Sequence, residues 1–248
     1  MGEHMTTNTY SALWFQLFLP LQEEWTHTEV AFLARQLPLP RYRRILDLAC
    51  GKGRHAFELA QRTYQVTGLD RDEAAITEAR RRAREARLDI VYLVGDMLQL
   101  DDLPGAFDAV ISMWQSFCYF DEETNVALLR SIFHKLTTGG RFVVDLYNRD
   151  YFEHHQGNTE QKIDGVTVKS QGYLQGNRWH SVLSYSNEHK ELGADHMEWQ
   201  IFTSHEFCTL ATTCGFTPLL VCTWAKETLP ASADVGRMQI VLEKSGAS

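Results

Sequence analysis

The chain has 248 residues, a length that allows one large domain or two small ones, and we expect one elaborated domain. Hydrophobic residues make up 44% and charged residues 23%, both typical of globular proteins, which excludes disordered and collagen-like chains. The net charge of −8 has the wrong sign for a protein that binds the phosphate backbone of nucleic acids, which argues against nucleic acid as the main partner.

Cysteine usage and the N-terminal residues indicate the compartment. The five cysteines are an odd set without a CxxC pair, so we expect reduced thiols in a cytoplasmic protein. The apolar residues 12–21 are interrupted by Gln16 and Pro20 and lack a basic leader, so we expect neither a signal peptide nor a membrane partner. Residues 1–5 are either native or an expression remnant, and no prediction depends on them.

Residues 1–40 are predicted to form a helical preface that acts as a lid. Leucines recur at four-residue spacing from Leu13 to Leu21, which predicts a helix with one apolar face. Pro20 should end or kink this helix, and a second helix is expected over residues 28–35.

Residues 41–150 alternate between short apolar runs and helical segments. Strands are expected at residues 45–49, 66–69, 90–94, 107–113 and 141–146, with helices between them that end near residue 62, cover 72–87 and run through 126–136. This order predicts an α/β fold with a parallel sheet covered by helices on both faces. Such sheets bind ligands at the carboxyl ends of their strands.

The pattern changes after residue 150, which predicts an antiparallel β insertion over residues 151–203. Gly165, Gly172 and Gly176 separate stretches that alternate between apolar and polar residues. We expect this insertion to bind the acceptor or to form a homodimer. Residues 204–248 should complete the core sheet with a helix over 204–214 and strands over 218–224 and 237–243.

The densest motif runs from Ile45 to Arg54, where a strand ends in an acid and leads through two glycines into a helix. Residues 51–56 fit G-x-G-x-x-A, the dinucleotide fingerprint, with Asp70 at a suitable distance. However, Asp47 sets a carboxylate beside the glycines, and this favours a cationic ligand over a pyrophosphate.

This stretch resembles the class I S-adenosylmethionine-dependent methyltransferases, whose first motif has the form h-h-D-h-x-C-G-x-G. Further segments resemble the later strands and the late helix of that family: Val66–Asp70, Val94–Met97, Phe107–Ile111, Gly139–Asp145 and Ala211–Phe216. The resemblance covers roughly residues 42–150 and 204–243. It implies a Rossmann-like, doubly wound, mostly parallel seven-stranded sheet, with S-adenosyl-L-methionine as cofactor and S-adenosyl-L-homocysteine as product.

The resemblance also implies roles for individual residues. The two glycines would admit the methionine moiety, the first strand-end acid would lie near its ammonium, the second would accept the ribose hydroxyls and the third the adenine amino group. The predicted cofactor site consists of Asp47, Ala49, Gly51, Gly53, Asp70, Arg71, Asp96, Met97, Ser112 and Met113.

Aromatic residues in and around the predicted insertion and preface are candidates for the acceptor site, although aromatics that follow a strand are also common in cores. They are Tyr10, Trp14, Trp114, Tyr119, Tyr147 and Trp179. If the acceptor must lose a proton, Tyr119, His55 or His180 could serve as the base, but no catalytic residue is assigned. The histidines lack metal-ligand spacing, so we expect no metal site and place the histidines after residue 150 in loops.

These observations predict a methyltransferase that moves a methyl group by in-line displacement to a nitrogen or oxygen of a small molecule. Residues Ser112–Gln115 do not match the N-P-P-Y pattern of enzymes that methylate adenine or glutamine amino groups. An RNA methyltransferase, a non-catalytic S-adenosylmethionine-binding module and an NAD-dependent oxidoreductase remain as alternatives.

Overall fold

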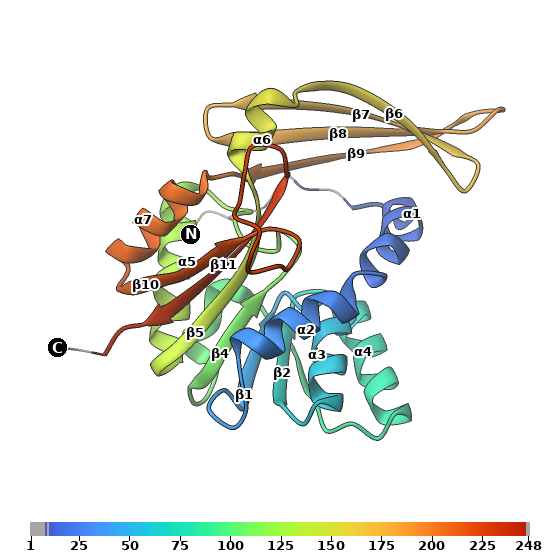
Figure 1. Ribbon diagram of the computed structural model, residues 1–248. Coiled ribbons are helices and arrows are strands. Elements are labelled where there is room, and N and C mark those ends of the chain that lie inside the picture. The colour runs from blue at the N-terminus through green and yellow to red at the C-terminus, as the bar shows by residue number, and fades with distance from the viewer. Residues whose placement is uncertain (1–7, 9, 247–248) are drawn as a thin grey trace.

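The computed structural model describes residue 8 and residues 10–246, and contains two sheets with helices around the larger one (Figure 1). The preface contains α1 (Ala12–Glu23) and α2 (Thr26–Gln36). The core contains β1 (Arg44–Leu48), α3 (Arg54–Gln61), β2 (Gln65–Asp70), α4 (Glu73–Glu85), β3 (Val91–Val94), the 3₁₀ turn η1 (Met97–Asp102), β4 (Phe107–Ser112), α5 (Glu122–Lys135), β5 (Leu136–Tyr147), α7 (Ser204–Thr213), β10 (Phe216–Cys222) and β11 (Arg237–Lys244). Between β5 and α7 lie α6 (Arg149–His154), β6 (Gly157–Ile163), β7 (Val166–Gln175), β8 (Arg178–Ser186) and β9 (Glu191–Gln200).

The larger sheet has seven strands in the order β10-β11-β5-β4-β1-β2-β3. Strands β1 to β5 run parallel to one another, and β11 runs antiparallel to both β5 and β10. The strand order reverses beside β1, so the carboxyl ends of β1 and β4 diverge there and leave a crevice. The predicted fold class is confirmed.

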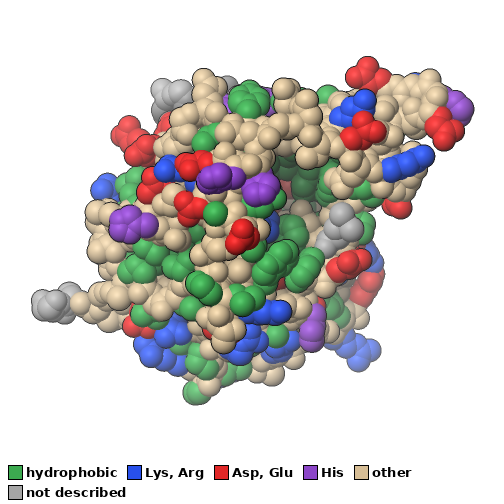
Figure 2. Space-filling model, turned by 45° about the horizontal axis from the view of Figure 1, so that its top comes forward, with side chains coloured by type: hydrophobic (Ala, Val, Ile, Leu, Met, Phe, Trp, Pro, Cys, Tyr) green, Lys and Arg blue, Asp and Glu red, His purple; other side chains and the backbone are tan. Residues whose placement is uncertain are grey.

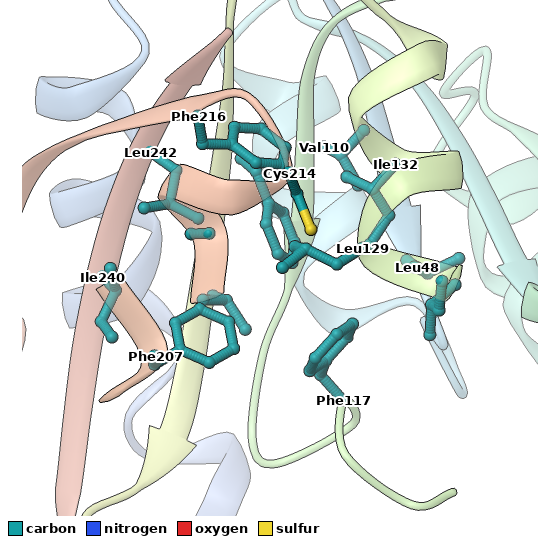
Figure 3. Close-up of a cluster of buried hydrophobic side chains, with 14 of the residues drawn as sticks. Leu48, Val110, Phe117, Leu129, Ile132, Phe207, Cys214, Phe216, Ile240 and Leu242 are labelled. Atoms are coloured by element: carbon teal, nitrogen blue, oxygen red, sulfur yellow. The ribbon is translucent and has the colours of Figure 1, made fainter. Parts of the chain in front are cut away.

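Helices cover both faces of this sheet. Successive strand residues point to opposite faces, and the helices bury the apolar side chains on each face. Leu48 and Val110 point toward α5 and α7, where they join Leu129, Phe207 and Phe216 in the buried cluster of Figure 3. Ile45, Ala109 and Val143 point to the other face and pack against α2, α3 and α4. Apolar residues buried on both faces explain why the strands read as continuous apolar runs in the sequence.

The smaller sheet, β6-β7-β8-β9, is antiparallel throughout and lies across the carboxyl edge of the core, above it in Figure 1. One face packs against α1, with Leu17 of the helix buried among Trp179, Tyr185 and Trp199. Asp195 of β9 is 2% exposed and accepts hydrogen bonds from the Tyr185 hydroxyl (2.7 Å) and from the N–H and the hydroxyl of Ser11, each at 2.8 Å. Since Ser11 caps the N-terminus of α1, this carboxylate fixes the helix to the sheet.

Three local predictions are wrong. Helix α1 continues through Pro20, because the packing of its apolar face outweighs the hydrogen bond that proline cannot make. Gly172 lies inside β7 instead of separating strands, since a Cβ there would come within 2.2 Å of the Trp179 ring. The histidines at 180 and 196 lie in β8 and β9, and those at 154 and 205 lie in α6 and α7, instead of loops.

Within residues 8 and 10–246, no helix combines the length and apolarity needed to cross a bilayer. The five cysteines are unpaired thiols, four of them buried. The division of the chain at residues 40, 150 and 203 stays a prediction.

Candidate active site

A cavity of about 1200 Å³ lies between the carboxyl edge of the core sheet and the four-stranded sheet. Figure 2 shows one part of the molecule hollowed beneath the four-stranded sheet. The cavity is walled by α1, by the loops that follow β1 to β5, and by the inner face of β7, β8 and β9. It therefore occupies the position where a doubly wound sheet binds its ligands.

Two of these loops adopt the left-handed backbone conformation. After β1, Ala49 and Gly51 have φ values of 57° and 53°, and after β4, Trp114 and Gln115 have values of 57° and 58°. This conformation is costly for residues other than glycine, and such strain clusters at ligand sites. A Cβ at Gly51 would meet nothing within 4 Å, so this backbone leaves open space at the cavity wall.

The acids at the ends of β2 and β3 are preorganised by backbone N–H groups. Asp70 accepts from the N–H of Gly51 at 2.7 Å and from that of Asp72 at 2.9 Å. Asp96 accepts from the N–H of Leu98 at 2.9 Å, and so caps the 3₁₀ turn that carries Met97. Each carboxylate oxygen has two acceptor sites, so both acids retain capacity for ligand hydroxyl or amino groups.

Asp47 lies at the end of β1 and is only 2% exposed. Burial raises the pKa of its carboxyl from 3.8 to about 7, although the nearby Arg54 guanidinium opposes this rise. One carboxyl oxygen has no hydrogen-bond partner among the described residues. A buried acceptor without a donor favours a ligand that brings a positive charge or an N–H group.

Most of the predicted cofactor residues line the cavity. They are Asp47, Ala49, Gly51, Asp70, Arg71, Asp96, Met97 and Met113. Gly53 and Ser112 do not reach its wall. Gly53 instead makes room for the Tyr92 ring, whose hydroxyl would lie 2.2 Å from a Cβ at this position, and Ser112 is completely buried.

Glu29 of α2 joins the preface to the start of α3 and to the strained loop after β4. Its carboxylate accepts from Arg54 at 2.8 Å, lies 2.8 Å from the His55 ring and accepts from the Trp114 indole N–H. Burial raises the pKa of Glu29, but hydrogen bonds and charges from His55 and Arg54 outweigh this effect and leave it below its ordinary value. The Glu29 side chain is 9% exposed and Arg54 12%, so this is a largely desolvated ion pair.

A second buried ion pair lies beside it. Arg237, at the start of β11, donates to Asp145 at 2.7 Å. Its guanidinium carbon lies 4.2 Å from the Trp114 ring centroid and 5.5 Å from that of Tyr147, within the range of cation–π interactions. The Arg54 guanidinium lies over the same indole at 5.2 Å, so charged groups position Trp114 at the cavity wall.

All six predicted acceptor residues line the cavity: Tyr10, Trp14, Trp114, Tyr119, Tyr147 and Trp179. The Tyr10 and Tyr119 hydroxyls are 3.2 Å apart. Burial raises the pKa of both phenols, so they are uncharged at neutral pH. Phe152 and Trp199 complete this aromatic wall, and the sequence did not single them out.

The three candidates for a general base lie in different environments. Tyr119 faces the cavity as a neutral phenol. His55 lines the cavity but is bonded to Glu29, and burial together with the charge of Arg54 lowers its pKa to about 4. His180 lies on the outer face of the small sheet, where its ring stacks on Tyr173 at 4.8 Å, because the residues of β8 alternate between faces.

Comparison with known proteins agrees with this geometry. Residues 45–140 match the family described as a methyltransferase domain. A putative methyltransferase of Bacillus subtilis, YqeM, is 32% identical over 111 residues, which cover 44% of this chain and 44% of that protein. Residues 45–140 therefore resemble a methyltransferase domain, in agreement with the resemblance that the sequence motifs carry.

Solved structures share the fold of this chain. An S-adenosylmethionine-dependent methyltransferase from Clostridium acetobutylicum has a TM-score of 0.79 at 14% identity, over 92% of this chain and 99% of that one. CalS10, an amino pentose methyltransferase from Micromonospora echinaspora, has a TM-score of 0.71 at 22% identity, over 96% and 99%. The segment matched to the Bacillus protein spans less than half the length of either chain.

Sequence patterns missed several residues that the cavity brings together. Arg54 follows the glycine motif directly, and its spacing could have indicated a wall residue. Glu29 and Arg237 had no such signal, because they meet Trp114 only through contacts across 85 and 123 residues of chain.

Proposed function

We propose that this protein transfers a methyl group from S-adenosyl-L-methionine to a nitrogen or oxygen of a small-molecule acceptor. The observation that carries the proposal is one continuous cavity with strand-end carboxylates at one end and an aromatic wall at the other. The amino pentose acceptor named for CalS10 supports a small-molecule acceptor here.

The residues at the carboxylate end fit this cofactor, which carries a sulfonium, an ammonium and a carboxylate. Asp47, with an oxygen that lacks a donor, would hold the ammonium, and the open space at Gly51 would admit the methionine moiety. Asp70 would accept the ribose hydroxyls, and Asp96 with Met97 would hold the adenine. When bound, S-adenosylmethionine supplies an activated methyl group.

The remaining chemistry belongs to the chain's own side chains. A sulfonium is already a good leaving group, so the protein's part is to align the acceptor and to exclude water. Helix α1 and the small sheet cover the cavity, and the aromatic wall would hold the acceptor against the loop after β4. We propose that residues 151–203 with the preface select the acceptor, and that the protein acts in the cytoplasm.

Calorimetric titration with S-adenosylmethionine, S-adenosylhomocysteine and NAD tests the cofactor. We expect binding of the first two and none of NAD, and we expect Asp47→Asn to weaken this binding by about tenfold or more. The matched control is Asp108→Asn, since Asp108 lies at the start of β4, where it pairs with Arg44 at 2.9 Å outside the cavity. Binding of NAD alone, or equal effects of the two variants, would refute the proposal.

Methyl turnover on a panel of small amines, alcohols and phenols tests the reaction itself. Release of S-adenosylhomocysteine that depends on one of these acceptors is the expected outcome. Cofactor binding without turnover of any acceptor would favour the non-catalytic alternative. Turnover of RNA fragments with a steep dependence on salt would favour an RNA substrate.

A further inference from the structure

We propose that the acceptor is an amine, methylated on nitrogen inside a chamber of aromatic rings that stabilises the resulting cation. This inference rests on the proposed function and names its substrate class. The aromatic chamber is the part of the cavity lined by Tyr10, Trp14, Tyr119, Tyr147, Phe152, Trp179 and Trp199.

The rings of the aromatic chamber form a connected wall. Tyr147 lies 5.0 Å from Phe152 and 5.2 Å from Trp199, measured between ring centroids, and Phe152 lies 4.5 Å from Trp179. Tyr10 lies edge-on to Trp14 at 4.8 Å. Aromatic faces attract cations, and this attraction grows when water is excluded.

Among the residues that the structure describes, the aromatic chamber offers no group that can take a proton from an alcohol. Burial raises the pKa of Tyr10, Tyr119 and Tyr147, so these phenols are neutral hydrogen-bonding groups at neutral pH. The described carboxylates on the cavity wall are Glu23 of α1, Asp72 at the start of α4, and the acids at the ends of β1 and β2 and after β3. Glu23 is exposed, and the others lie at the cofactor end.

The nearby buried charges are already neutralised. Glu29 is paired with Arg54, and Asp145 is paired with Arg237. His55 has a pKa of about 4 because burial and Arg54 disfavour its charged form, and its ring is bonded to Glu29. These pairs provide neither a free base for a hydroxyl acceptor nor a net charge that would repel an amine.

A neutral amine satisfies these conditions because its lone pair attacks without loss of a further proton, and an ammonium ion reaches this form by giving its proton to water before it enters the chamber. The nitrogen forms a bond to the methyl carbon while the carbon–sulfur bond breaks and its electron pair stays on sulfur. The positive charge then resides on nitrogen, facing the aromatic rings, and a proton is lost to solvent after release. A hydroxyl would instead have to transfer its proton to a base during the attack.

Two molecules of nearly identical shape test the recognition of a cation: (4-hydroxyphenyl)trimethylammonium and 4-tert-butylphenol. They are titrated by calorimetry into the full chain saturated with S-adenosylhomocysteine. We expect the ammonium probe to bind about tenfold more tightly than the uncharged one. Equal or tighter binding of 4-tert-butylphenol, or no binding of the ammonium probe, would overturn the inference.

Variants of Tyr10 distinguish the contribution of its ring from that of its hydroxyl group. Tyr10→Leu removes a ring of the aromatic chamber and should weaken ammonium binding by about fivefold, whereas Tyr10→Phe keeps the ring and should leave it nearly unchanged. Tyr173→Leu, on the outer face of β7, is the control and should change nothing. Equal losses in Tyr10→Leu and Tyr10→Phe would also overturn the inference. If the wild-type chain does not bind S-adenosylhomocysteine, the proposed function is refuted, and the inference, which rests on it, is refuted as well.

Discussion

Replacement of Asp47 by asparagine should stabilise the free protein at alkaline pH while it weakens cofactor binding. Burial raises the pKa of this carboxyl from 3.8 to about 7. Between these values the folded chain keeps a proton that the unfolded chain has lost, so the contribution of Asp47 to the free energy of unfolding falls as pH rises. The total loss is about 4 kcal/mol, of which about 3 kcal/mol falls between about pH 5 and pH 8.

Urea denaturation of the wild type and of Asp47→Asn, followed by circular dichroism at several pH values, measures this loss. Asparagine does not titrate, so the difference in unfolding free energy between the two proteins isolates the carboxyl from other groups. We expect this difference to change by about 3 kcal/mol between about pH 5 and pH 8, in favour of the variant at the higher pH. A difference that does not vary with pH would refute the reasoning.

Cofactor binding provides an independent measurement of the same carboxyl. A cationic ligand beside Asp47 favours its charged form, so S-adenosylmethionine binding at about pH 6 should release close to one proton. Calorimetry in two buffers with different heats of ionisation counts this proton. Binding without proton release would mean that Asp47 does not face the cationic part of the ligand.

Three further substitutions probe other parts of the site. Glu29→Gln leaves Arg54 without its buried partner and should lower the free energy of unfolding by about 3 kcal/mol at neutral pH. Because the pKa of Glu29 is lowered in the folded state, urea denaturation should show this difference shrinking below about pH 4.5, and a loss under about 1 kcal/mol would contradict the pairing. Gly51→Ala should cost about 1 kcal/mol of stability and about tenfold or more in calorimetric cofactor affinity, whereas Gly165→Ala, which has a similar positive φ in the β6–β7 turn, should cost stability alone. Asp195→Asn should raise hydrogen exchange in α1 and β9 but not in β1 or β4, and uniform exchange across the chain would show that the carboxylate is no local anchor.

The core was predictable because its signals are local. Strands such as β1 and β4 are buried on both faces and read as apolar runs, and the glycine motif at 51–53 marks the turn into α3. The carboxyl ends of parallel strands lie at one edge of the sheet, so the sequence alone predicts that Asp47, Asp70 and Asp96 share one site.

Residues that act across long stretches of chain were not predictable. Glu29 sits in a helix of mixed composition, and only the packing of α2 against the core brings it to Trp114. His180 was predicted to lie in a loop and was considered as a base. It lies in β8 instead, where the alternation of side chains directs it to the face opposite Trp179. The prediction that the first helix ends at Pro20 was wrong for a similar reason. The tertiary packing of α1 outweighs the low helix propensity of proline.

The hydrogen bonds from Ser11 to Asp195 have a consequence for the design of chimeric enzymes. They join two segments that are 184 residues apart in the chain but form one roof over the aromatic chamber. A graft that exchanges only the sheet of residues 157–200 would therefore separate the carboxylate from its two donors and leave α1 without its cap contact. A chimera should instead exchange residues 10–25 and 157–200 together, because these two segments form a single unit.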